Sequence, residues 1–109
     1  MARAPTTLDA FAAVAEPKRR RVLELLAEGE LPVNDLVDSL GWPQPMVSKH
    51  LGVLKEVGLV VVREDGRQHY YRINGETMKR IHDWTRTFER FWSRQLDRIK
   101  ERAERKARD

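Results

Sequence analysis

Residues 33–73 have the sequence VNDLVDSLGWPQPMVSKHLGVLKEVGLVVVREDGRQHYYRI, and this stretch decides the fold. It begins with two amphipathic segments, 33–40 and 44–57, whose apolar residues recur every three or four positions, as in helices. Proline is tolerated only in the first turn of a helix, so the prolines on either side of Gln44 place the second helix start near that residue. Two short helices joined by a glycine-containing turn predict a helix-turn-helix over residues 33–57.

The sequence changes its periodicity after the second of these helices. Leu59–Glu64 is rich in valine, His69–Ile73 is aromatic and β-branched, and Asp65-Gly66 lies between them. β-branched and aromatic residues favour strands, and an Asp-Gly pair between two such runs favours a tight hairpin turn. A β-hairpin is therefore expected over residues 59–73, which makes the unit a winged helix-turn-helix.

Helical patterns lie on both sides of this unit. Two short amphipathic segments, 8–15 and 17–28, precede it, and residues 76–106 follow it without a proline or glycine. The predicted order is helix-helix-helix-helix-strand-strand-helix, a mainly α chain with a small β-hairpin (α+β class). We expect a single winged-helix domain over residues 1–109 that ends in a long helix.

Composition restricts the classes of function. The 109 residues include 21 Lys and Arg against 17 Asp and Glu, a net charge of +4, and no cysteine. A basic surface favours polyanionic partners, and the missing thiols exclude disulfides and cysteine-based metal or redox sites. No apolar run approaches the roughly 18 residues of a membrane span. We expect a cytoplasmic, nucleoid-associated protein with no membrane partner.

The remaining polar residues do not form a catalytic or metal-binding pattern. The three histidines, His50, His69 and His82, fall on three different predicted elements, and no two have the spacing of metal ligands. No nucleophile, base and orienting group recur at a workable spacing either. We therefore expect no metal site, no cofactor and no enzymatic activity.

The second helix of the helix-turn-helix has two chemically different faces. A rotation of 100° per residue gathers three aliphatic residues on one face and leaves small, polar and basic residues opposite. Such side chains hydrogen-bond to phosphates and base edges, and an arginine on a wing tip reaches a narrow minor groove. The candidate DNA contacts are Gln44, Pro45, Met46, Ser48, Lys49, Gly52, Arg63, Arg67 and Gln68.

Simpler interpretations remain open for several of these residues. Solvated surface positions would show the same pattern, Met46 also suits the edge of the core, and surface hairpins often carry arginine for solubility. The basic run 18–21 either contacts phosphates or forms a solvated helix start.

The last predicted helix carries an aromatic stripe. Residues 76–106 would extend for about 46 Å at 1.5 Å per residue, too long for this small domain to bury. An exposed stripe of this kind calls for a partner, and a second copy is the simplest one. The candidate dimer contacts are Leu8, Phe11, Val14, Ile81, Trp84, Phe88, Phe91, Trp92, Leu96 and Ile99. An effector cavity shared near Trp84 and Phe91 is a further possibility, and it is compatible with dimer packing.

Four segments together resemble the ArsR family of bacterial winged-helix regulators over residues 8–74. They are Glu16–Leu23, Val33–Leu36, Val47–Val60 and Gly66–Ile73. The most specific part is Ser-x-His-Leu-x-x-Leu-x-x-x-Gly-Leu-Val, which starts at Ser48. The resemblance implies a homodimeric transcriptional repressor with a recognition helix at 44–57, dimer contacts from the first and last helices, and an effector that releases DNA.

The chain departs from the metal-sensing members of that family. It has no cysteine, and Arg80 stands where an aspartate would precede His82. Ser93 and Leu96 stand where a later pair of ligands would be. The resemblance is therefore to the cysteine-free subgroup that does not sense metal.

We expect a sequence-specific regulator that binds double-stranded DNA, acting as a homodimeric repressor on a palindromic operator. The alternative is a winged-helix interaction module whose aromatic C-terminal helix docks another protein. A small-molecule effector of unknown chemistry is compatible with the first function.

Overall fold

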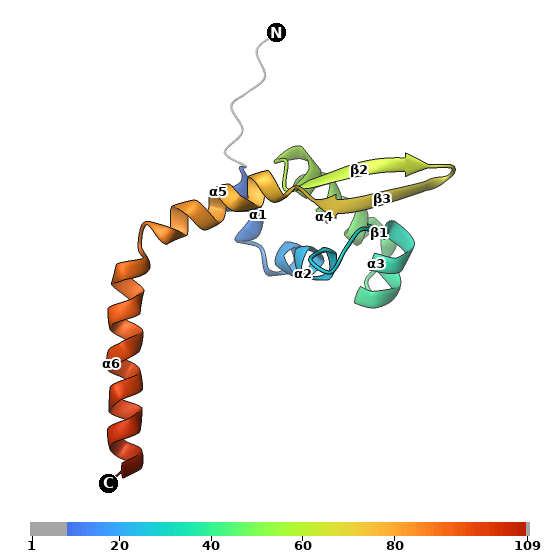
Figure 1. Ribbon diagram of the computed structural model, residues 1–109. Coiled ribbons are helices and arrows are strands. Elements are labelled where there is room, and N and C mark those ends of the chain that lie inside the picture. Colours follow the sequence, from blue (N-terminus) through green and yellow to red (C-terminus); the bar gives the residue numbers. More distant parts are fainter. Residues whose placement is uncertain (1–8, 109) are drawn as a thin grey trace. The chain divides into compact units, whose positions relative to one another are not determined.

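The computed structural model describes residues 9–108, which divide into two compact units, one ending at Met78 and one starting at Lys79. Figure 1 traces the elements along the chain. They are α1 (Ala10–Val14), α2 (Pro17–Leu26), β1 (Leu31–Pro32), α3 (Val33–Leu40), α4 (Gln44–Glu56), β2 (Val60–Asp65), β3 (Gln68–Ile73), α5 (Gly75–Arg86) and α6 (Glu89–Arg108).

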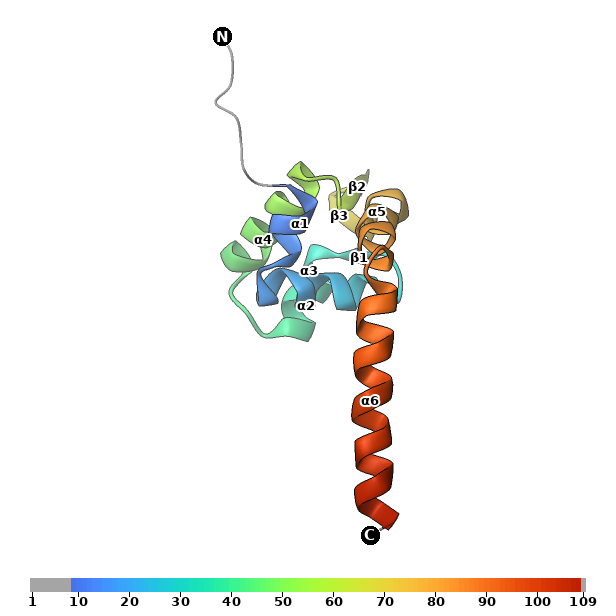
Figure 2. The same ribbon diagram turned by 90° about the vertical axis from the view of Figure 1, so that its left-hand side faces the viewer.

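The core of the first unit lies between α1, α2, α3, α4 and the start of the wing. α4 packs against α2, α3 and β2, and α1 contacts both α2 and α4 (Figure 2). The buried apolar residues come from all of these elements: Ala13, Val22, Leu23, Leu26, Leu36, Val47, Leu51, Leu54, Leu59 and Val60. The aliphatic face predicted for α4 is confirmed, since Val47, Leu51 and Leu54 are all fully buried.

The helix-turn-helix has the predicted boundaries. α3 ends at Gly41, whose φ of 69° is the left-handed conformation that glycine adopts at little cost. α4 begins at Gln44 with Pro45 in its first turn, as the prolines predicted. The wing has the predicted two strands, joined through Gly66, whose φ is 63°. The fold class, a mainly helical winged helix-turn-helix with a small antiparallel sheet, is therefore confirmed.

A third strand was not predicted. β1 pairs with β3, with Leu31 opposite Tyr71 and Pro32 opposite Tyr70, so the antiparallel sheet has the order β1-β3-β2. Two residues are too few to show a strand period, and a proline in a sequence normally argues against a strand unless it lies at a sheet edge. β1 occupies such an edge.

The first helix is shorter than predicted. α1 starts at Ala10, and the Asp9 side chain accepts a hydrogen bond from the Ala12 amide at 2.9 Å, the usual arrangement of an N-cap. Leu8, a predicted dimer contact, lies outside the described residues.

The single long helix predicted over residues 76–106 is wrong, because the chain forms two helices, α5 and α6, with a break at Thr87 and Phe88. At the break the amide of Thr87 bonds to the carbonyl of Trp84 at 3.1 Å and that of Phe88 to Thr85 at 3.0 Å, a tightened turn. The Thr85 hydroxyl also bonds to the His82 carbonyl at 2.8 Å. Two β-branched threonines with back-bonding hydroxyls weaken the helix without any proline or glycine.

Candidate nucleic-acid interface

The outward face of α4 carries the side chains predicted to read DNA. Gln44, Pro45, Ser48, Lys49 and Gly52 are all exposed, while the opposite face of the helix is anchored in the core. The face is therefore held rigidly and remains open to a partner.

Met46 lies at the edge of this face. It is half-buried, and its sulfur lies 3.8 Å from the Lys18 ammonium, which also lies 5.9 Å from the centre of the Trp42 ring. This position fits the core-edge interpretation of Met46 as well as a contact with DNA.

Gly52 is not required by the packing of the protein. A Cβ built at this position meets no atom within 4 Å, and the residue lies inside an ordinary helix. Glycine in a helix interior is less favourable than alanine by roughly 0.8–1.0 kcal/mol. Its effect on the surface is to keep the centre of the α4 face flat, which suits close approach by DNA.

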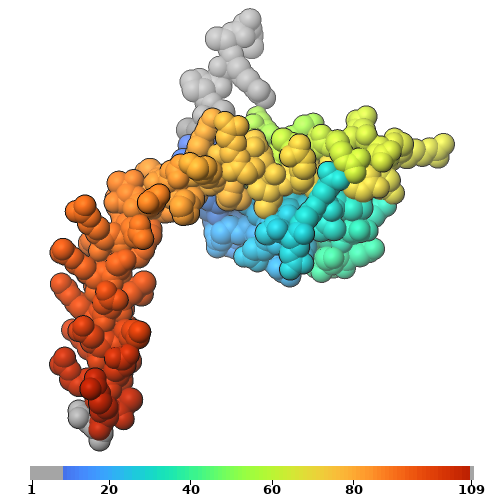
Figure 3. Space-filling model, viewed as in Figure 1, coloured from blue at the N-terminus to red at the C-terminus, as the bar shows by residue number. Residues whose placement is uncertain are grey.

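The wing extends away from the helices of the first unit and presents its tip to solvent (Figure 3). Arg67 and Gln68 lie at this tip and are exposed, as predicted. The wing and α4 do not stand apart: they share one surface hollow of about 320 Å³. It is lined by Val33, Asn34, Gln44, Ser48, Arg67, Gln68, His69 and Tyr71.

The structure therefore brings together four predicted contacts, Gln44, Ser48, Arg67 and Gln68, from two elements. Asn34, His69 and Tyr71 line the same hollow but were absent from the predicted set. His69 and Tyr71 are two residues apart on β3 and share one face of the strand. That alternation was visible in the sequence, but their closeness to α4 was not.

Arg63, another predicted DNA contact, interacts with side chains of its own chain. Its guanidinium lies 2.7 Å from the Glu30 carboxylate and 3.5 Å from that of Asp65. It also stacks on the Tyr70 ring at 4.5 Å. The hydrogen bond that Arg63 donates to the Glu30 carboxylate is the main cause that raises the pKa of Arg63. Arg63 thus connects β2 across Tyr70 to the segment before β1, and it does not line the shared hollow.

The basic run of residues 18–21 serves the protein itself in part. Arg19 donates to the Ala13 carbonyl at 2.8 Å, and Arg20 donates to the carbonyls of Val14 and Ala15 at 2.9 and 3.1 Å. These two side chains satisfy acceptors at the C-terminal end of α1. Both alternatives that the sequence left open for the run stay open, because Lys18 and Arg20 are also exposed.

His50 lies on α4, and its side chain is half-buried beside Trp42. Its Nδ1 is buried and has no hydrogen-bond partner in the described structure, and its ring contacts Trp42 edge to face at 6.2 Å. Burial is the main cause that lowers the pKa of His50 below 6.5, and the nearby positive charge of Arg19 lowers it further. The neutral ring is the form that this site stabilises.

The predicted dimer contacts are the exposed apolar residues of the structure. Phe91 is 71% exposed, and none of the described residues from 79 to 108 is buried. The large exposed apolar side chains are Phe11, Trp84, Phe88, Phe91, Trp92, Leu96 and Ile99. Of the other three predicted contacts, Val14 and Ile81 are half-buried, and Leu8 lies outside the described residues.

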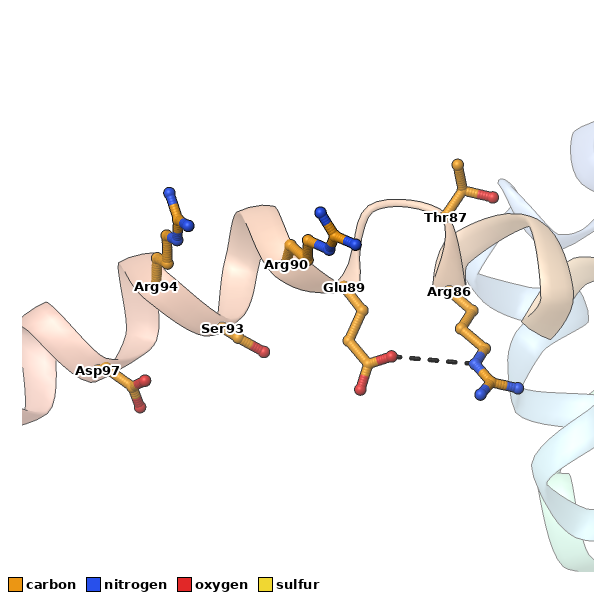
Figure 4. A pocket seen from close by; sticks show the side chains of 7 residues that line it. All are labelled: Arg86, Thr87, Glu89, Arg90, Ser93, Arg94 and Asp97. Carbon is orange, nitrogen blue, oxygen red and sulfur yellow. Dashed lines mark ion pairs between the residues drawn. The ribbon is translucent and has the colours of Figure 1, made fainter.

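A hollow of about 690 Å³ beside the α5–α6 break lies in the second unit. Figure 4 shows its lining, with Arg90 and Arg94 projecting together from α6 and Arg86 4.0 Å from Glu89. The lining residues are polar and charged, and they do not include Trp84 or Phe91, where an effector cavity was considered.

Two further features bear on the class of protein. Among residues 9–108, no three histidine, aspartate or glutamate side chains gather closely enough to hold a metal ion. Within the same residues, no helix has both the length and the apolar character needed to cross a bilayer.

Comparisons with known proteins agree with this architecture. Residues 16–62 match the family model described as bacterial regulatory protein, arsR family. An uncharacterised HTH-type transcriptional regulator of Methanocaldococcus jannaschii is 39% identical over 74 residues, which cover 67% of this chain and 83% of that protein. The transcriptional repressor SdpR of Bacillus subtilis is 28% identical over 80 residues, covering 73% of this chain and 89% of SdpR.

Solved structures agree as well. The crystal structure of a possible transcriptional regulator for arsenical resistance superposes with a TM-score of 0.69 at 40% identity. The match covers 85% of this chain and 94% of the other. The chain therefore belongs to the arsR family of bacterial regulatory proteins, and it is a DNA-binding transcriptional regulator, not an enzyme.

Proposed function

We propose that the protein is a homodimeric repressor that binds an inverted repeat in double-stranded DNA. The observation that carries this proposal is that the exposed face of α4 and the wing tip line one hollow. A helix of this size fits the major groove, and a wing arginine suits the adjacent minor groove. Gln44, Ser48, Lys49 and Gly52 would face base edges and phosphates, with Arg67 and Gln68 on the wing.

The homodimer follows from the apolar side chains of the second unit. α6 presents Trp92, Leu96 and Ile99 on one face, and all three are exposed in the single chain. Exposed apolar patches of this kind mark interaction sites. A second copy offers the same face, and symmetric dimers are the commonest assemblies of soluble proteins. Two copies place two α4 helices on one DNA molecule. A symmetric dimer of this kind prefers an inverted repeat.

Selection of bound sequences from a random duplex pool tests the proposal. We expect an inverted repeat with half-sites about one helical turn, roughly 10 bp, apart or a small multiple of it. With roughly six to ten phosphate contacts per dimer, affinity should fall about 10³- to 10⁵-fold between 50 and 200 mM salt. A pool that yields no enriched sequence, or binding insensitive to salt, contradicts the proposal.

Regulation by release from DNA is the last part of the proposal. The chain carries no cysteine, so an effector would have to act through groups other than thiolates. A repressor of this kind would reside on the nucleoid.

A further inference from the structure

The hollow between α3, α4 and the wing is lined mainly by hydrogen-bond donors. Val33 is its only apolar member, and the other seven side chains can each donate a hydrogen bond. None of the eight residues, all within the described part of the chain, carries a carboxylate. Arg67 supplies a permanent positive charge. Many donors, one cation and no acid in the lining are the chemistry of an anion site.

Two other hollows on the molecule differ in this respect. The one at the C-terminal end of α2 includes Glu28 and Glu30, and the one beside the α5–α6 break includes Glu89 and Asp97. Each of these would oppose an anion. In addition, α3 and α4 both begin beside the donor-lined hollow after a proline, without a side-chain cap in the described structure. The uncapped amide groups at the start of α3 add to the attraction for an anion. The start of α4 adds less, because Pro45 has no amide hydrogen and the Met46 amide bonds to the Pro43 carbonyl.

The position of the hollow indicates which anion it meets. A helix in the major groove and a wing in the neighbouring minor groove are separated by one sugar-phosphate strand, because that strand is the wall between the two grooves. The hollow lies between α4 and the wing, so it faces that strand. Its volume of about 320 Å³ is roughly ten times the ~30 Å³ share of one water molecule, enough for a phosphodiester group with bridging waters.

We propose that this hollow seats one backbone phosphate of the bound DNA, with Asn34, His69 and Tyr71 as contacts alongside Arg67. This inference rests on the proposed DNA-binding mode and adds three residues from outside the recognition helix and the wing tip. Because phosphates carry no sequence information, the seat fixes the register of α4 on the duplex and leaves base recognition to α4 itself.

Two neighbouring tyrosines on β3 allow a phosphate contact to be tested separately from a structural effect. Successive side chains of a strand point to opposite faces, so Tyr70 and Tyr71 differ in their surroundings. Tyr71 lines the hollow, whereas the ring of Tyr70 stacks on Arg63. His69 lies on the Tyr71 side, with the Glu64 carboxylate 3.7 Å from its Nδ1. Tyr71→Phe and Tyr70→Phe are therefore a matched pair that removes one hydroxyl from each face.

Binding of the two tyrosine variants to an operator duplex and to a scrambled duplex gives the first test. Tyr71→Phe should weaken both complexes by the same factor, about three- to tenfold for each of the two hydrogen bonds lost per dimer, and Tyr70→Phe should leave both unchanged. Asn34→Ala should behave like Tyr71→Phe. A loss confined to the operator would mean base recognition, and no loss would mean no contact; either result overturns the phosphate seat.

Single methylphosphonate substitutions along the operator backbone give the second test. Each substitution replaces one charged phosphate with a neutral group. At one position in each half-site the effects of the DNA change and of Tyr71→Phe should be smaller together than their product, because both remove the same contact. Independent effects at every position overturn the seat. If the wild-type chain binds no duplex at all, the proposed function has failed instead, so the two failures are distinguishable.

Discussion

The two units of this chain differ in the burial of their apolar side chains. The first buries ten aliphatic residues between its helices and the wing, whereas none of the described residues from 79 to 108 is buried. The second instead exposes two tryptophans, two phenylalanines, a leucine and an isoleucine. Burial of apolar area is the main favourable contribution to folding. The first unit therefore draws its stability from its own chain, whereas the apolar side chains of the second unit form the interface of the proposed dimer.

The largest expected effect comes from charging the apolar face of α6. Trp92→Glu with Leu96→Glu should raise the dimer dissociation constant by more than about a thousandfold, since each buried side chain contributes roughly 1.5–3 kcal/mol and occurs twice. Sedimentation or light scattering measures the loss. DNA affinity should fall with it, while the unfolding transition of the first unit should remain.

A charge-matched control separates this effect from electrostatics. Arg90→Gln with Arg94→Gln also lowers the net charge by two, and both arginines lie on the opposite side of α6. This variant should remain dimeric. If both double variants stay dimeric, the face of Trp92 and Leu96 is not the interface.

Removal of Lys49 should have the next largest effect. Lys49→Ala takes a cation from the exposed face of α4, and loss of a base contact costs about 1–3 kcal/mol and relaxes preference at one position. Titration against single-base variants of the operator measures both. Lys55→Ala, in the last turn of the same helix, is the control and should change less. Unchanged operator affinity of Lys49→Ala would remove it from the interface.

Gly52→Ala should change stability and binding in opposite directions. The added methyl group meets no protein atom within 4 Å, so the fold should become more stable by roughly 0.8–1.0 kcal/mol, measured by urea unfolding. DNA affinity should fall because the methyl group stands on the flat centre of the α4 face. Gly75→Ala, also free of steric contact, should leave affinity unchanged. A more stable Gly52→Ala variant with full affinity would show that DNA does not approach closely there.

The ion pair of Arg63 provides a smaller test within the first unit. Glu30→Gln removes the carboxylate 2.7 Å from Arg63, an exposed pair worth at most about 1 kcal/mol. If Arg63 positions the wing, affinity should fall slightly and the salt dependence should stay the same. If Arg63 instead binds a phosphate when released, affinity should rise and the salt dependence should steepen.

The smallest effect concerns pH. Since the folded state lowers the pKa of His50 below its unfolded value near 6.5, the unfolded state binds the proton more readily there. The stability gained from the neutral ring is therefore present above pH 6.5 and is lost as pH falls through and below that value. The groups that act on His50 are Arg19, Glu16, Lys18 and Lys49.

Urea unfolding on both sides of pH 6.5 measures this effect. His50→Phe, which keeps an aromatic ring beside Trp42, should lose less stability on acidification than the wild type. His82→Asn, at a side chain that is 70% exposed, should behave as the wild type does. Identical pH profiles for wild type and His50→Phe contradict the assignment.

The sequence predicted those features of the fold that residues determine locally. The helix-turn-helix and wing were predictable because Pro45, Gly41 and Gly66 act locally on the backbone. β1 was missed since two residues have no period, and the break at Thr87 was missed since its cause is a pair of hydroxyl groups, not proline or glycine. The faces of α4 and α6 followed from helical spacing alone.

Contacts between distant residues could not be predicted in this way. Glu30 lies 33 positions from Arg63, and no local pattern links Asn34 to His69 and Tyr71 across the shared hollow. Such contacts depend on how the elements pack, which is why the predicted interface included Arg63 and omitted Asn34, His69 and Tyr71, which line the hollow.

Light scattering of the full chain, alone and with a duplex that carries the selected inverted repeat, tests the central claim most directly. The account predicts a mass of two chains in the absence of DNA, and of two chains and one duplex after it is added. A single chain whose mass does not change when the duplex is added would contradict it, and would favour a module whose aromatic helix docks a different protein.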